Sequence, residues 1–218
     1  MLVFIDPGHG GSDPGAVSNG LMEKDINLQV ALRLRDILEN NGIATVMSRD
    51  DDTYVGINQR VRMANQSGAD YFISIHANAG GGEGTETLYY TRESVPFAEI
   101  IQNNFVNQMG TIDRGIIFRD NLGVIKRTYM PSVLLELGFI DSPVDADMLQ
   151  NRQEDMAWAI ANGFFELLGM SPMSRAKNSR RPRETSRDRV HKESPPSKAS
   201  SKNSVLPFLL FMTICGKK

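Results

Sequence analysis

The chain has 218 residues, of which 40% are hydrophobic, with a single cysteine and a net charge of −2. This length supports one good-sized core, and one cysteine excludes an intrachain disulfide framework. Residues 1–170 carry 12 basic against 23 acidic side chains, whereas residues 171–218 carry 12 against 3. The acidic first part argues against a nucleic-acid-binding core. We therefore expect a domain over residues 1–170 and a basic tail over residues 171–218.

Strand-like and helix-like patterns alternate through the first 170 residues, which predicts an α/β domain. Apolar runs predict strands at 2–5, 43–47, 71–76, 85–90 and 132–137. Helical periodicity predicts helices at 25–41, 55–67 and 96–109, and one broken or two short helices over 144–168. We expect Asp25 to cap the first helix, and Gly42 and Gly68 to end the first two. In the second helix, Ile57, Val61 and Ala64 are expected to face inward.

The basic tail has a composition that does not support a packed core. Ser, Arg, Lys and Pro dominate residues 171–204, so we expect this segment to be disordered. The apolar run over residues 205–215 contains Pro207 and is short of the roughly 20 residues that span a bilayer, so no transmembrane span is expected. The chain opens on a strand-like run without a signal-peptide pattern, which favours synthesis in the cytoplasm.

Two of the three histidines follow apolar strand-like runs. His9 lies in the glycine-rich turn after the opening strand, and His76 ends the run over residues 71–76. Each alone is compatible with a backbone-bonded or core histidine. Because neighbouring strand ends in one sheet converge, the two imidazoles together predict a shared metal site. The turn lacks the last glycine of a G-x-G-x-x-G motif, and no Gly-Lys-Ser/Thr follows, so nucleotide binding is not expected.

Two carboxylates are candidates to complete such a site. Glu23 precedes the first helix, where it could be the third zinc ligand or merely favour the positive end of the helix. Glu136 interrupts the apolar run over residues 132–137, where an ionised carboxylate needs a cation or a catalytic role. One interpretation pairs Glu136 with a buried arginine such as Arg49; the other makes it the general base that takes a proton from the attacking water.

Four segments resemble, in order and spacing, the zinc-dependent N-acetylmuramoyl-L-alanine amidases of the amidase-3 family: residues 4–11, Glu23, residues 74–78 and residues 133–140. The resemblance covers residues 2–168. It implies a twisted, mostly parallel sheet flanked by helices, with His9, Glu23 and His76 as Zn²⁺ ligands and Glu136 as the catalytic glutamate. It also implies hydrolysis of the amide that joins the lactyl group of N-acetylmuramic acid to L-alanine in peptidoglycan.

Several alternatives remain open at the level of sequence. A zinc peptidase or amidase with another amide substrate would use the same ligands, and a catalytically silent wall-binding protein could keep the fold. The missing signal fits the endolysins and the sporulation-linked amidases of the family, which reach the wall after lysis or through a holin. The tail could contact an anionic wall polymer or a membrane surface, or be dispensable. Asn78 and Arg127 are candidate groove contacts.

Overall fold

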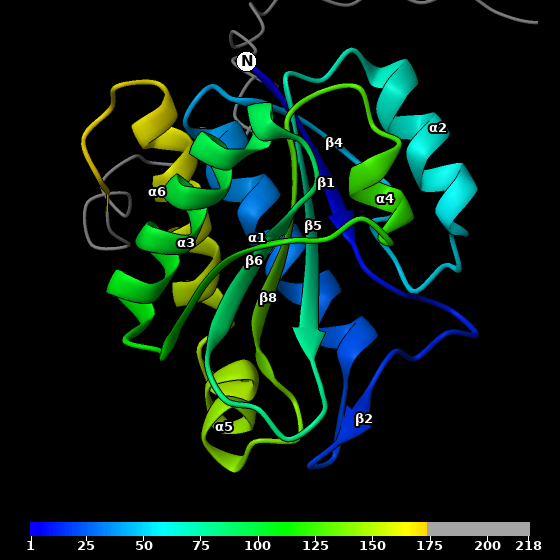
Figure 1. The fold of residues 1–218 in the computed structure, drawn as a ribbon, viewed down its shortest axis with the longest axis vertical. Helices are drawn as coiled ribbons and strands as arrows, with labels where there is room; N and C mark the ends of the chain where they lie inside the picture. Colours follow the sequence, from blue (N-terminus) through cyan, green and yellow to red (C-terminus); the bar gives the residue numbers. More distant parts are fainter. Residues whose placement is uncertain (174–218) are drawn as a thin grey trace, which may run out of the picture. The chain divides into compact units, whose positions relative to one another are not determined.

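A six-stranded sheet forms the centre of residues 1–173, which are the part of the chain that this computed structural model describes (Figure 1). Its strand order is β4-β1-β5-β8-β6-β7. The bounds are β1 (Leu2–Pro7), β4 (Ala44–Met47), β5 (Tyr71–Asn78), β6 (Thr85–Tyr89), β7 (Asp113–Phe118) and β8 (Ser132–Phe139). All neighbouring pairs are parallel except β6 and β8. The predicted single, mostly parallel sheet is therefore confirmed.

Helices cover both faces of this sheet. α1 (Glu23–Asn40), α3 (Val95–Met109) and α6 (Gln153–Leu167) pack on one face and share the larger apolar core with α5 (Pro143–Asn151). The other face carries α2 (Ile57–Ser67) and the short α4 (Gly123–Lys126) over a smaller core. Figure 1 shows α2 and α4 near the upper ends of β5 and β8, away from the lower ends of these strands.

The apolar and polar positions of β8 alternate between these two faces. Val133, Leu135 and Leu137 belong to the larger core, whereas Leu134 belongs to the smaller one. Since side chains two residues apart point to the same side of a strand, Glu136 shares the face of Leu134. Glu136 therefore lies on the α2 and α4 side of the sheet, near the lower end of β8.

Two details of the predicted helices are wrong. α1 begins at Glu23 with Met22 as its N-cap, so Asp25 lies inside the first turn and does not cap it. The preceding loop supplies a hydrogen-bond acceptor for the start of α1, because the Glu23 N–H donates to the Ala16 carbonyl. Ile57 is 55% exposed, while Val61 and Ala64 are buried as predicted. The inward position next to them is taken by Arg60, which reaches a buried carboxylate.

Three further elements were not predicted: the hairpin of β2 (Val17–Ser18) and β3 (Leu21–Met22), the edge strand β7 and the one-turn helix α4. A short 3₁₀ turn, η1 (Arg92–Ser94), precedes α3. The last predicted helical segment is two helices, α5 and α6.

The end of the described chain folds back onto α6. The Met173 N–H donates to Asn162 Oδ1 over 2.8 Å. The expected disorder of residues 171–204 and the apolar run over residues 205–215 fall outside the described part beyond Met173, so the boundary after Met170 stays a prediction. Within residues 1–173, no helix combines the length and the apolar character needed to cross a membrane.

Candidate metal centre

The side chains of His9, Glu23 and His76 converge on one point. One potential ligand atom from each lies within 4.8 Å of those of the other two. Glu23 bridges the two rings: its Oε2 is 3.1 Å from His9 Nε2, and its Oε1 is 2.8 Å from His76 Nδ1. The imidazoles meet edge to face, with ring centroids 5.0 Å apart. The structure thus brings together the three residues that the sequence singled out as ligands.

The neighbouring strands β1 and β5 determine this convergence. They are parallel and pair Pro7 with Ile75, so both chains reach the same edge of the sheet. His9 follows two residues after Pro7, and His76 follows directly after Ile75. Glu23 is the first residue of α1 and is returned to this edge by the loop and hairpin that follow β1. Its side chain therefore points across the strand ends and is buried.

Two glycines leave room for the ligand side chains. A Cβ atom at Gly8 would lie 2.2 Å from the ring of His76, and a Cβ atom at Gly15 would lie 2.5 Å from Glu23 Oε2. His9 itself adopts φ = 60°, a left-handed conformation that costs a non-glycine residue about 1–3 kcal/mol. The surrounding structure must offset that cost, and the glycine-rich turn is shaped around the three converging side chains.

Arg60 supplies part of this support from beneath the turn. Its buried guanidinium pairs with Asp6 Oδ1 at 2.6 Å and donates to the carbonyls of Pro7 and His9, each at 2.6 Å. The carboxylate of Asp6 is also satisfied by the hydroxyls of two buried serines, Ser48 and Ser74. A buried ion pair with these added hydrogen bonds fixes the backbone on both sides of Gly8.

Arg49 holds the same turn from another direction. It donates to the carbonyls of Pro7 and Gly8 at 3.1 and 2.8 Å, and to that of Lys24 at 2.9 Å. It therefore ties the turn that carries one ligand to the helix start that carries another. The alternative that Arg49 forms a salt bridge with Glu136 is wrong, because the Arg49 guanidinium donates to four backbone carbonyls, those of Pro7, Gly8, Lys24 and Asp51.

The electrostatics of the three side chains suit a cation. Burial would raise the pKa of Glu23, but hydrogen bonds to His76 and His9 hold it far below its usual range. Burial would lower the pKa of His9, but its contacts with Glu23 and Asp13 raise that pKa to about 9. Asp13 Oδ2 lies 2.9 Å from His9 Nδ1. The carboxylates thus favour a proton on His9, and a divalent cation bound by the three side chains would replace that positive charge.

Glu136 lies next to the three converging residues, in register with His76 on the neighbouring strand. Its Oε2 is buried and has no hydrogen-bond partner within residues 1–173. Burial raises the pKa of Glu136 to about 7; the interaction with His76 opposes this shift, and the carboxylates of Glu23 and Glu86 add to it. A carboxyl group that titrates near neutrality can both accept and return a proton.

Glu86 is a second buried carboxylate, which the sequence analysis did not single out. It is the cross-strand partner of Glu136 and accepts hydrogen bonds from Asn78 Nδ2 at 3.1 Å and from Arg114 Nε at 2.7 Å. The sequence feature that could have identified Glu86 is similar to that of Glu136. Both are carboxylates inside a segment that is otherwise typical of a strand. Asn78 is thus near the site.

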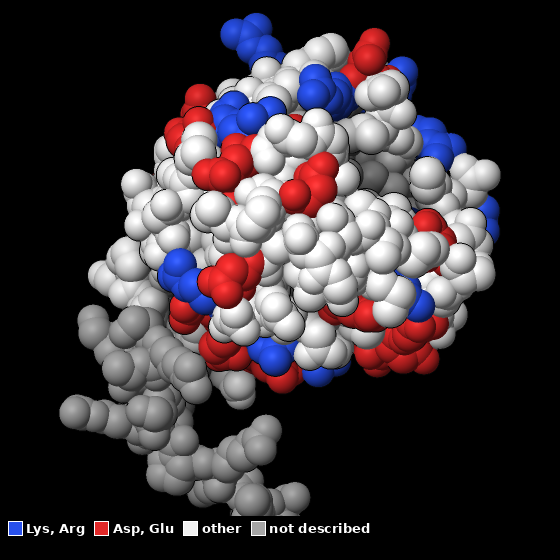
Figure 2. Space-filling model, turned by 90° about the horizontal axis from the view of Figure 1, so that it is seen from below, with Lys and Arg blue, Asp and Glu red and all other residues white. Residues whose placement is uncertain are grey.

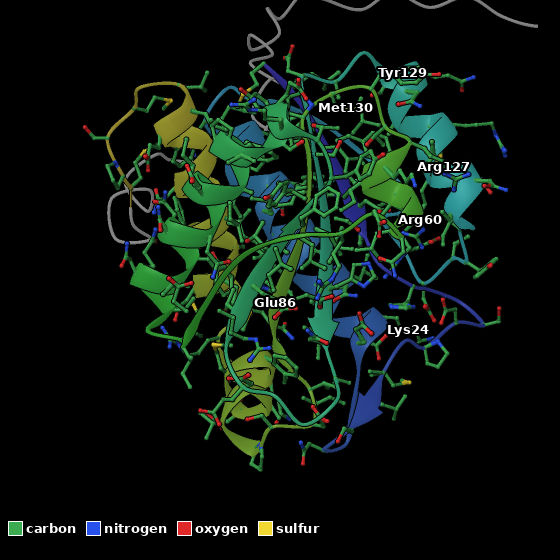
Figure 3. All side chains as sticks on the ribbon, in the orientation of Figure 1. Lys24, Arg60, Glu86, Arg127, Tyr129 and Met130 are labelled. Carbon is green, nitrogen blue, oxygen red and sulfur yellow. The ribbon has the colours of Figure 1, made fainter. Side chains whose placement is uncertain are left out.

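Arg127, the other candidate groove contact, lies against Gly123, which lines a cavity beside the two histidines. It donates to Asn58 Oδ1 and to the carbonyl of Gly123, between α2 and α4. In Figure 3 it is labelled in the upper right with Tyr129, whereas Glu86 and Lys24 are labelled lower down. The role of Arg127 as a groove contact therefore stays a prediction.

A cavity of about 250 Å³ adjoins the two histidines on the α2 side. Its far wall is largely apolar and comes from the loop before α2, from α4 and from β8, with Tyr54, Val55, Ile57, Leu122, Val124 and Leu134. Tyr54 and Ile57 are 56% and 55% exposed. Neither Glu136 nor Glu86 lines this cavity, so it extends from the histidines in another direction.

Comparison with known proteins places this site in context. Residues 3–166 match the family described as N-acetylmuramoyl-L-alanine amidase. The sporulation-specific N-acetylmuramoyl-L-alanine amidase of Bacillus subtilis (strain 168) is 41% identical over 181 residues, covering 80% of this chain and 71% of that protein. The endolysin of Bacillus phage SPP1 is 36% identical over 185 residues, which cover 79% of this chain and 68% of the endolysin. Among solved structures, the chain superposes with a TM-score of 0.74 on the catalytic domain of CwlV, an N-acetylmuramoyl-L-alanine amidase of Bacillus (Paenibacillus) polymyxa var. colistinus. The two are 39% identical, and the match covers 78% of this chain and 99% of the CwlV domain.

Proposed function

We infer, since the chain belongs to the amidase-3 family of N-acetylmuramoyl-L-alanine amidases, that it cuts peptidoglycan with the help of a zinc ion held by His9, Glu23 and His76. The bond hydrolysed is the amide between the lactyl group of N-acetylmuramic acid and L-alanine. One observation carries the proposal: two imidazoles and a carboxylate converge within 4.8 Å beside Glu136, whose buried Oε2 has no hydrogen-bond partner within residues 1–173.

The donor set fits zinc. Two histidines and one glutamate are a common set of protein ligands in catalytic zinc sites, which keep a further position for water or substrate. The contact of Asp13 with His9 Nδ1 is the kind of outer interaction that orients a metal-ligating imidazole. When bound, zinc supplies Lewis-acid chemistry, because it acidifies water and polarises a carbonyl group.

Glu136 is proposed to move the proton. As a carboxylate it accepts a proton from the water that adds to the lactyl carbonyl carbon. The carbon–nitrogen bond then breaks, its electron pair stays on nitrogen, and the proton on Glu136 passes to that nitrogen. The products are the free carboxylate of the lactyl group and the free amino group of L-alanine. The burial that raises the pKa of Glu136 suits a group that must hold the proton between the two steps.

The wall is the proposed place of action. Relatives include a protein called an endolysin and one called sporulation-specific, so release by lysis or through a holin remains the proposed route to the wall. Contact of the basic tail with an anionic wall polymer or a membrane surface is likewise a proposal. It rests on the excess of 12 basic over 3 acidic side chains in residues 171–218.

Elemental analysis tests the identity of the metal. We expect one zinc ion per chain after purification and reconstitution. Glu23→Ala should lose it, because this carboxylate contacts both imidazoles. Glu99→Ala, at an exposed position of α3, is the control and should retain it. Retention of stoichiometric zinc by Glu23→Ala would overturn the assignment of the ligands.

A further inference from the structure

A polar strip crosses the open face of the sheet from the proposed metal ligands to the edge strand. His76 on β5 is in register with Glu136 on β8, which is in register with Glu86 on β6. Glu86 Oε2 then accepts a hydrogen bond from Arg114 Nε, on β7, at 2.7 Å. Four neighbouring strands thus place His76, Glu136, Glu86 and Arg114 side by side. This strip leads away from the metal ligands in a single direction.

The position of Glu136 in this strip determines which part of the substrate lies there. In the proposed reaction, on which this inference rests, Glu136 gives its proton to the nitrogen of L-alanine. The leaving nitrogen must then lie on the Glu136 side of the metal ligands, within hydrogen-bond reach of that carboxyl group. The peptide that follows this nitrogen continues in the same direction, over Glu86 and toward Arg114.

The opposite arm of the substrate has its own place. The cavity of about 250 Å³ touches His9 and His76 and has Tyr54 and Leu122 on its far wall. It lies toward α2 and α4, whereas the strip runs toward β7. The acyl arm, which carries the lactyl methyl group and the sugar, is the part that remains for this largely apolar cavity.

Arg114 is suited to bind an anion at the end of the strip. Its side chain is 38% exposed and is fixed by Glu86 through Nε alone. The guanidinium lies over the ring of Phe139, 4.8 Å from its centroid. Within residues 1–173, its two terminal amino groups make no hydrogen bond. A guanidinium held in this way offers a preorganised pair of N–H donors to a carboxylate.

We propose that Arg114 binds a carboxylate of the leaving peptide, and that the enzyme thereby selects stem peptides with a free carboxylate on the residue after L-alanine. The face of the molecule seen from the lower end of the sheet supplies no such selection by charge alone. Figure 2, viewed from the lower end of the sheet, shows acidic and basic side chains interspersed among uncharged areas. Recognition of the anion therefore depends on one placed guanidinium and not on a field of a single sign.

The test compares two N-acetylmuramoyl peptides in which the residue after L-alanine carries either a free carboxylate or the corresponding carboxamide. With the zinc-loaded full chain we expect kcat/KM to be about tenfold higher for the carboxylate, the scale of a hydrogen bond to a charged group. Arg114→Gln should abolish this preference by lowering the rate on the carboxylate peptide, and Arg114→Lys should keep part of it. Arg92→Gln, at the exposed turn beyond the other end of β6, is the charge-matched control and should keep all of it.

A binding measurement decides the proposal independently of catalysis. The released peptides are titrated into the protein while the Arg114 side-chain N–H signal and the Tyr54 amide signal are followed by NMR. We expect the carboxylate peptide to move the Arg114 signal and to bind about tenfold more weakly to Arg114→Gln. An unchanged preference or affinity in Arg114→Gln, or a shift confined to Tyr54, would overturn the proposal. If the wild type cleaved neither substrate, the proposed function would fail, and the titration would still decide the role of Arg114.

Discussion

His76 and Glu136 are cross-strand partners on β5 and β8, so that a proposed zinc ligand and a buried carboxyl group share one row of the sheet. The Oε2 atom of Glu136 has no hydrogen-bond partner in the described part of the chain. A buried polar atom left unpaired costs stability, about 1–3 kcal/mol for a neutral group and more for a charged one. Such a cost is expected where the group must remain free for a reacting molecule.

The first prediction concerns this carboxyl group. Glu136→Gln keeps the shape of the side chain but cannot accept a proton, so we expect kcat to fall by at least about 100-fold. Bound zinc should remain stoichiometric, because Glu136 is not one of the three proposed ligands. Glu99→Gln, at an exposed position on α3, is the matched control and should leave both quantities unchanged. Near-normal turnover by Glu136→Gln would remove Glu136 from the proposed mechanism.

The second prediction concerns the space that Gly8 leaves. In Gly8→Ala the new Cβ would lie 2.2 Å from the ring of His76, so the imidazole must move. We expect zinc affinity to fall by at least about tenfold, since a ligand is displaced from its place. Gly56→Ala is the control, because its nearest non-bonded neighbour would be the hydroxyl of Tyr54 at 3.7 Å. Isothermal titration of zinc into both variants measures the effect, and equal affinities would contradict it.

The third prediction concerns the support beneath the metal-ligand turn. Arg60→Met would leave the carboxylate of Asp6 buried and without its cation. Breaking a buried pair in this way costs about 3–5 kcal/mol of unfolding free energy. We expect this loss in urea unfolding of the metal-free protein. Arg62→Met, at an exposed position of the same helix, should change it by less than about 0.5 kcal/mol. A loss in Arg60→Met no larger than in Arg62→Met would show that the pair does not hold the turn.

The fourth prediction concerns protons at the metal site. The pKa of His9 is raised to about 9 in the metal-free form, so below that pH a proton must leave His9 when zinc binds. Apparent zinc affinity should therefore rise with pH, by about tenfold per pH unit for one released proton. Calorimetry at pH 8 in two buffers of different ionisation enthalpy counts the released protons. Equal heats in the two buffers, with no rise in affinity between pH 7 and pH 8.5, would contradict this account.

Much of the site was predictable because it depends on strand ends. His9 and His76 follow apolar runs, and parallel neighbouring strands end at the same edge, so their meeting follows from the α/β pattern. Glu136 could be recognised by its place in an apolar run. The role of Glu86 was missed, although its strand was predicted and the same reasoning applies to it, because only the pairing of β6 with β8 places it opposite Glu136.

Other features could not be read from local patterns. Helical periodicity places Ile57 inward, but the inward position belongs to Arg60. Arg60 forms an ion pair there with the buried carboxylate of Asp6, which is distant in sequence. The start of α1 at Glu23 depends on carbonyls of the preceding loop and not on a capping side chain. The edge strand β7 is exposed or half-exposed along its length and begins with Asp113 and Arg114, so it lacks the buried apolar run that identified the inner strands. In these elements the contacts with other parts of the chain, and not the local sequence pattern, determine the structure.

The most direct test of the central claim is digestion of purified sacculi with the reconstituted protein, followed by analysis of the new termini. We predict new free amino groups on L-alanine without new reducing sugar ends, loss of this release with a chelator, and its return with zinc. Glu136→Gln should release none. New reducing ends, or release that a chelator does not affect, would contradict the account.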